Sequence, residues 1–207
     1  MVDCPDQKYS FEEAKEIVLR GLAPLGADYQ ELLQKGFDGR WIDVYENEGK
    51  RTGAYSWGTY QSHPYVLLNY HGTLADVFTL AHEMGHSIHS WYSNHTQPYR
   101  YSGYRIFVAE VASTCNEALL IHDLLDRTED EAERRYLINY FLDQFKSTMF
   151  RQTMFAEFER DTHAAVQRGE TLTSEALCSA YSELNRRYFG EAMEADEDIA
   201  FEWQRIP

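Results

Sequence analysis

Apolar residues recur at helical spacing along most of the chain, which predicts a mainly helical protein. Ser10 and Glu13 match a capping box that opens the first helix, because each side chain can accept a hydrogen bond from the other residue's backbone N–H. Helices are predicted over residues 11–22, over a segment that follows Pro24 and ends at Gly36, and over residues 74–91, 107–125 and 174–189.

The longest helical pattern begins after Thr128, which forms a second predicted capping box with Glu131. The pattern continues to Gly169 with no internal glycine or proline. Such a helix would be about 57 Å long, whereas a compact domain of this size has a radius of gyration of about 17 Å. We therefore expect it to bend, to protrude or to pack on something absent from this chain.

Between residues 40 and 70 the apolar positions alternate instead, which predicts three short strands over residues 41–45, 53–57 and 65–70. They are expected to form a small antiparallel sheet immediately before the helix of residues 74–91. Its edge could hold an extended peptide through backbone hydrogen bonds. An ordinary supporting sheet explains the pattern equally well, and the sequence leaves both interpretations open.

The helix of residues 74–91 contains the pattern His-Glu-x-x-His, in which His82 and His86 lie one helical turn apart and present two imidazoles to one point. That geometry suits a zinc ion. Glu83 lies one position around the helix, where its carboxylate can reach the open side of such a site without being a ligand. Thr73 with Asp76 predicts the start of this helix as a further capping box.

A catalytic zinc usually has three protein ligands, so a third must come from elsewhere. Glu110 is the predicted ligand and Glu117 the predicted partner of a ligand histidine's ring N–H; both lie on one face of a helix of mostly small or apolar residues. The alternative is an exposed acidic edge. His89 continues the histidine stripe, but a rigid helix cannot easily fold three successive turns around one ion, so we expect it to orient a ligand, face the substrate or pack.

Composition narrows the choice of function further. The 207 residues predict a single domain over 1–207, and no apolar stretch is long enough for a membrane span. The formal charge of −15 argues against nucleic acid as a partner. Cys4, Cys115 and Cys178 are widely spaced and odd in number, which fits a reduced, cytoplasmic setting better than a disulfide framework. No secretory signal is apparent at the start.

Several stretches taken together are similar to oligoendopeptidase F, the bacterial branch of the thimet oligopeptidase family of zinc metallopeptidases. They are residues 40–45, 49–55, 63–70, 82–93, 97–99, 107–117 and 150–159. The resemblance implies a mainly α, zincin-like catalytic domain that binds one zinc ion per chain through His82, His86 and Glu110, with Glu83 as the catalytic acid and base.

The resemblance also implies cleavage of short oligopeptides inside a deep channel, usually in the cytoplasm. The substrate would lie along the edge of the small sheet. Candidate substrate contacts are Gly53, Ala54, Tyr55, His89, Tyr101 and Tyr104.

Members of this family are much longer than 207 residues, with a helical lobe before the part that resembles this chain and a further segment after it. That segment normally brings a histidine and tyrosines over the metal. The resemblance therefore implies that this chain is part of a catalytic domain, with the missing lobes of the same protein as partners, and that it is weakly active or inactive alone. The alternative is a catalytically incompetent, metal-binding domain that binds peptides.

Overall fold

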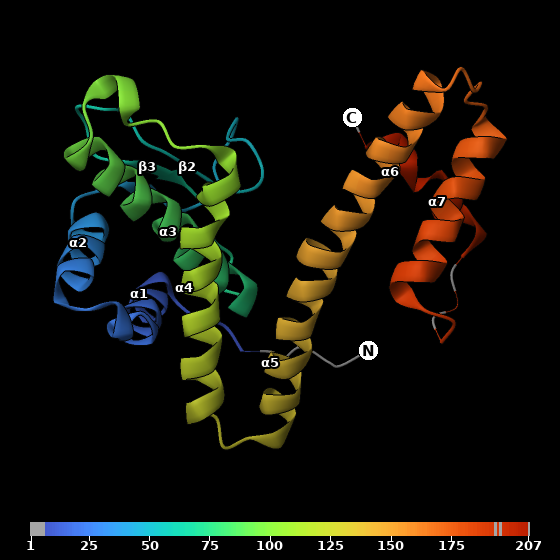
Figure 1. The fold of residues 1–207 in the computed structure, drawn as a ribbon. Coiled ribbons are helices and arrows are strands. Elements are labelled where there is room, and N and C mark those ends of the chain that lie inside the picture. The colour runs from blue at the N-terminus through green and yellow to red at the C-terminus, as the bar shows by residue number, and fades with distance from the viewer. Residues whose placement is uncertain (1–6, 193, 195, 207) are drawn as a thin grey trace. The chain divides into compact units, whose positions relative to one another are not determined.

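The computed structural model describes residues 7–192, 194 and 196–206, so Cys4 lies outside the described residues. The chain divides into two compact units, Met1–Ile138 and Asn139–Pro207, which are described separately. The helices of the first unit are α1 (Phe11–Gly21), a 3-10 turn (Ala23–Leu25), α2 (Ala27–Asp38), α3 (Leu74–Thr96), a 3-10 turn (Tyr99–Tyr101) and α4 (Ile106–Arg127) (Figure 1). The predicted mainly helical fold is confirmed.

The helix ends follow local hydrogen bonds. The predicted capping boxes of Ser10 with Glu13 and of Thr73 with Asp76 are both present. The prediction that α3 ends near residue 91 is wrong, because it continues to Thr96. Nothing before Pro98 interrupts the backbone pattern, and the residue preceding a proline is driven to an extended conformation, which Gln97 adopts with φ −114° and ψ 147°.

The small sheet contains β1 (Ile42–Asp43), β2 (Tyr55–Trp57) and β3 (Tyr65–Leu67) in the order β1-β3-β2. β3 pairs antiparallel with β2 but parallel with β1. The expectation of a wholly antiparallel sheet is therefore wrong for β1. An alternating pattern predicts strands but not their neighbours, and here the third strand enters between the first two.

The core of the first unit is built around α3, whose apolar side chains are buried on several sides. They include Val77, Phe78, Leu80, Ala81, Met84 and Ile88. Asn116 on α4 is buried and links two further helices: its side-chain amide donates to the Ala81 carbonyl at 2.8 Å and accepts from the Tyr29 hydroxyl at 2.9 Å. This chain of hydrogen bonds fixes α2, α3 and α4 beside the His-Glu-x-x-His segment.

Close approach of α3 and α4 depends on Gly85. A Cβ atom at this position would lie 2.8 Å from the Ser113 Cα and 2.9 Å from the Ala112 carbonyl oxygen, and these backbone atoms cannot move aside. Gly85→Ala should therefore lower the free energy of unfolding by about 1–3 kcal/mol, as overpacking does, measured by urea denaturation.

Gly103→Ala is the matched control, because a Cβ there meets nothing within 4 Å. It should leave the urea midpoint almost unchanged. Equal midpoints for both variants would contradict the tight contact between α3 and α4.

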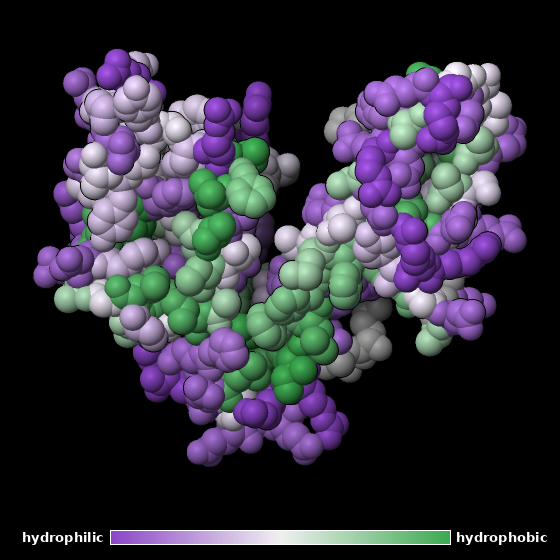
Figure 2. Space-filling model, viewed as in Figure 1, coloured by the Kyte–Doolittle hydropathy of each residue, from purple (hydrophilic) through white to green (hydrophobic). Residues whose placement is uncertain are grey.

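The start of α4 lies at the surface. Figure 2 shows hydrophobic side chains gathered over its first turns, where Ile106 and Phe107 are 84% and 89% exposed. Leu120 and Ile121, further along the helix, are fully buried. α4 therefore presents Glu110 from an exposed stretch while its later turns anchor it in the core. None of the described helices combines the length and apolar character needed to cross a bilayer.

The long helical pattern leads into the second unit. It forms α5 (Glu131–Gln144), a π-helical segment (Phe145–Phe150) and α6 (Arg151–Gln167), and the backbone stays helical at both joins. The predicted capping box of Thr128 with Glu131 is wrong. Asp130 is the cap, since its carboxylate accepts the Glu133 N–H at 2.8 Å, and Thr128 contacts the Glu133 side chain instead.

The second unit also contains α7 (Ser174–Phe189) and a 3-10 helix (Glu197–Arg205). Its core consists of Met154, Phe158, Tyr181 and Leu184. The predicted end of α7 at Gly190 is confirmed, with φ 76° at this glycine. Near the C-terminal end of the described residues, Glu202 accepts hydrogen bonds from the Tyr181 hydroxyl at 2.6 Å and from Arg151.

Candidate metal centre

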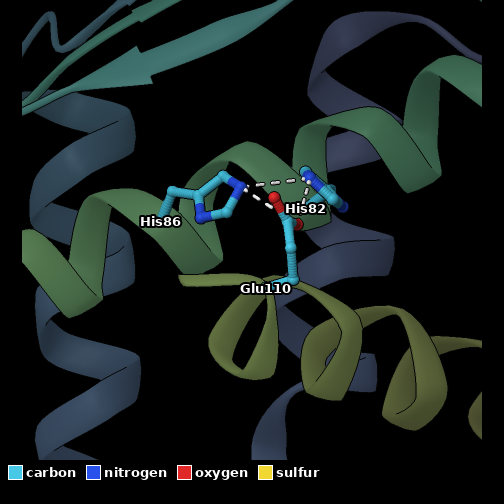
Figure 3. A group of neighbouring side chains, drawn as sticks. All are labelled: His82, His86 and Glu110. Atoms are coloured by element: carbon cyan, nitrogen blue, oxygen red, sulfur yellow. Dashed lines mark hydrogen bonds and ion pairs between the residues drawn. The ribbon is translucent and has the colours of Figure 1, made fainter. Parts of the chain in front are cut away.

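Two neighbouring helices bring three potential ligands together. α3 carries His82 and His86 one turn apart, and α4 crosses beside them and directs the Glu110 carboxylate toward both rings (Figure 3). Within the described part of the chain, these three form the group of His, Cys and acidic side chains whose ligand atoms lie close enough to share an ion. His89, which continues the histidine stripe on α3, is not part of the group.

The distances between the donor atoms fit a tetrahedral ion. The Nε2 atoms of His82 and His86 are 3.2 Å apart, and Glu110 Oε2 lies 3.4 Å and 3.5 Å from them respectively. Bonds of 2.0–2.2 Å at tetrahedral angles separate neighbouring ligand atoms by about 3.3–3.5 Å. The three donor atoms are thus spaced as three corners of a zinc coordination tetrahedron would be.

The orientation of His82 is set from α4. The Glu117 Oε1 atom lies 3.1 Å from His82 Nδ1, and because an ionised carboxylate only accepts hydrogen bonds, Nδ1 must carry the proton. The Nε2 atom is then the unprotonated nitrogen, and it faces His86 and Glu110. Burial lowers the pKa of His82, but the Glu117 hydrogen bond and the nearby carboxylates outweigh it and raise the pKa overall. Glu117 therefore lies where its predicted role requires.

The pKa of His86 is shifted in the opposite direction to that of His82. Burial lowers the pKa of its imidazole, and the charge of Glu110 and a backbone hydrogen bond at Ala109 only partly oppose this effect. The ring therefore favours the neutral form, which is the form that binds a metal ion.

Glu83 is a buried acid without a hydrogen-bond partner on one oxygen. Only 7% of the residue is exposed, and Oε2 has no partner among the described residues. Burial raises the pKa of Glu83 to about 7, against the opposing effect of His82. An unpartnered polar atom at this depth is costly unless something else occupies the space beside it. A polar group bound next to His82 and His86 would give this atom a partner.

The candidate substrate contacts fall into two groups. His89 stacks on Tyr104 with ring centroids 3.8 Å apart, and the Tyr104 hydroxyl lies 2.9 Å from the Ser90 hydroxyl. Burial lowers the pKa of His89, whose Nδ1 has no partner among the described atoms. Tyr101 is exposed on a different segment, the 3-10 turn.

The second group lies on the sheet edge. Tyr55 is exposed in β2, and Gly53 and Ala54 precede it, with φ 88° at Gly53. β2 is an edge strand and is joined to α3 by a 2.8 Å hydrogen bond between Ser56 and Ser87. The carbonyl of Gly53 accepts the Asn69 amide at 2.9 Å, which occupies one of its two acceptor sites.

Ser113 makes a contact with Glu110 that the sequence analysis does not predict. Its hydroxyl donates to Glu110 Oε2 at 2.8 Å, and the side chain is fully buried. The spacing of three residues along a helix is the available signal, since residues i and i+3 are neighbours on the helix surface.

Two histidines one turn apart and a carboxylate from a second helix are a combination typical of catalytic rather than structural zinc sites. The chain belongs to peptidase family M3, whose family model matches residues 7–206. It is 54% identical over 200 residues to Oligopeptidase PepF of Bacillus subtilis, a match that covers 97% of this chain and 30% of that protein.

Other proteins similar to this chain are named oligoendopeptidase F. The chain is 50% identical to the chromosomal oligoendopeptidase F of Lactococcus lactis, over 98% of this chain and 34% of that protein. The crystal structure of oligoendopeptidase-F from Enterococcus faecium matches with a TM-score of 0.63 and 37% identity, over 96% of this chain and 28% of that one. The resemblance to oligoendopeptidase F is thereby confirmed. The chain spans about a third of the length of the curated relatives it matches.

Proposed function

We propose that this protein is a zinc-dependent endopeptidase that hydrolyses short oligopeptides. The observation that carries the proposal is the spacing of 3.2–3.5 Å among the three donor atoms of His82, His86 and Glu110, beside a buried and unpartnered Glu83. Membership of peptidase family M3 supports peptides as the substrate class.

Zinc is the proposed cofactor, one ion per chain. A structural zinc would usually have four Cys or His ligands, whereas the described cluster supplies two histidines and one carboxylate. When bound, zinc acts as a Lewis acid and lowers the pKa of a water molecule to about 7.

Glu83 is the proposed general base and acid. Because burial raises its pKa to about 7, the carboxyl group can both accept and release a proton near neutral pH. It would remove the proton of the attacking water and then deliver it to the amine that leaves. His82 and Glu117 would hold their present contact throughout, which keeps the His82 ring in one tautomer.

The substrate is proposed to lie along β2, where an extended peptide can add to the sheet edge through backbone hydrogen bonds. Gly53, Ala54 and Tyr55 are the proposed contacts on this edge. The stacked His89 and Tyr104, together with Tyr101, are proposed to contact substrate side chains.

The setting of the protein is also proposed. We infer a cytoplasmic enzyme that acts on peptides. Nucleic acid is not the proposed substrate, because the formal charge of −15 repels phosphate. Both compact units are proposed to belong to one catalytic domain. Segments that correspond to the unmatched two thirds of the relatives are proposed to enclose the site.

A peptide blocked at both ends tests this function. N-acetylated and C-amidated oligopeptides of 6 to 12 residues should be cut at internal bonds, with the products identified by mass spectrometry, because an endopeptidase needs no free terminus. Binding of the peptide without any cleavage, even after the segments that correspond to the unmatched two thirds of the relatives are added, would favour the alternative, a metal-containing domain that holds peptides but does not hydrolyse them.

A further inference from the structure

Glu110 differs from the two histidines of the cluster in how much freedom its side chain has. The carboxylate side chain is 55% exposed, compared with 26% for His82 and 16% for His86. A long, partly exposed side chain of this kind populates several rotamers unless something holds it. A ligand that must be ordered when the metal binds reduces the affinity of the site.

The hydroxyl of Ser113 is placed to supply that restraint. It donates to Glu110 Oε2 at 2.8 Å, which is the oxygen that faces both histidines, and lies 3.1 Å from the Glu110 backbone carbonyl. The charged carboxylate is the stronger of the two acceptors. An oxygen of a carboxylate has two acceptor sites, so the same atom can accept this hydrogen bond and also bind an ion.

Ser113 itself is closely packed. It is fully buried at the contact between α3 and α4, where its Cα would lie 2.8 Å from a Cβ at Gly85. Ser113 is therefore held against α3 by packing, and its hydroxyl is held to Glu110 by the hydrogen bond. Its position relative to the two histidines is set by the same contact.

We propose that Ser113 is a positioning residue for the metal centre: its hydroxyl holds the Glu110 carboxylate in the orientation that completes the ligand group with His82 and His86. The inference rests on the proposed function, since it assumes that the cluster binds zinc. It assigns a role to a residue whose other evident role is to let two helices pack closely.

Thr114 provides a matched control. Its hydroxyl also donates to Glu110, but to the backbone carbonyl at 2.5 Å, and it lies on the exposed side of α4. Thr114→Ala and Ser113→Ala therefore each remove one hydroxyl that bonds to the same residue. Only the second removes a contact with the carboxylate.

The test is zinc affinity, measured by competition with a chromophoric chelator. Ser113→Ala should weaken zinc binding roughly 10- to 100-fold, the usual cost of removing a group that orients a ligand. Thr114→Ala should bind zinc as tightly as the unsubstituted protein. Urea midpoints of both variants show whether the fold is kept.

A double-mutant cycle separates positioning from packing. In a Glu110→Ala background the two histidines still bind zinc weakly, and Ser113→Ala should then cause no further loss, because its partner is gone. An equal loss in both backgrounds would mean that Ser113 only spaces the helices and would overturn the inference. If the unsubstituted protein binds no zinc, the proposed function fails; if it binds zinc and Ser113→Ala changes nothing, this inference fails alone.

Discussion

Replacing Glu83 with Gln should lower kcat/KM for a quenched oligopeptide by roughly two to four decades, the usual contribution of a general acid and base. Glutamine keeps the size of the side chain but cannot take up a proton. Because Glu83 is not in the ligand group, the variant should still bind one zinc ion per chain. Peptide hydrolysis and metal content, measured on the same preparations, check both parts.

Glu16→Gln is the control for this substitution. Glu16 is exposed on α1, outside the metal cluster, so the same chemical change there should leave hydrolysis unaltered. Loss of zinc from Glu83→Gln would show that Glu83 supports the site structurally. Unchanged hydrolysis with zinc bound would remove it from the mechanism.

Removal of one ligand should abolish both hydrolysis and the stabilisation that zinc provides. A free zinc concentration 100 times the dissociation constant should raise the free energy of unfolding of the unsubstituted protein by about 2.7 kcal/mol, because the ion binds only the folded state. In His86→Ala the same zinc concentration should have almost no effect. Urea denaturation with zinc and with a chelator measures the difference.

His163→Ala is the comparison for this experiment. His163 is exposed on α6, with its ring bonded to the Glu159 carbonyl, and it belongs to the other compact unit. The variant should keep the full response to zinc. A zinc response that survives in His86→Ala would place the ion elsewhere and would contradict the proposed ligand set.

Features that depend on neighbours along the chain could be predicted. The capping boxes at Ser10 and Thr73 and the end of α7 at Gly190 are where the sequence places them. Each depends on contacts within about four residues, which the order of side chains specifies. Thr128 shows the limit of this reasoning, because Asp130 competed for the same role and became the cap.

The shared direction of His82 and His86 could also be predicted from local spacing. His82 and His86 are four residues apart on a helix, so their rings lie on one side whatever the rest of the fold does. Glu110 is predicted as the third ligand from its place on a helix of mostly small or apolar residues, with an exposed acidic edge as the alternative, and the family resemblance then supports the ligand.

The sequence by itself therefore determined the helices, the ends marked by Ser10, Thr73 and Gly190, and the shared direction of His82 and His86, since these depend on local spacing. The tertiary structure decided the strand order and the meeting of Glu110 with both histidines. It also decided the burial that raises the pKa of Glu83 to about 7. These properties depend on distances between segments far apart in the chain, and only the packing of α3 against α4 and the sheet sets those distances.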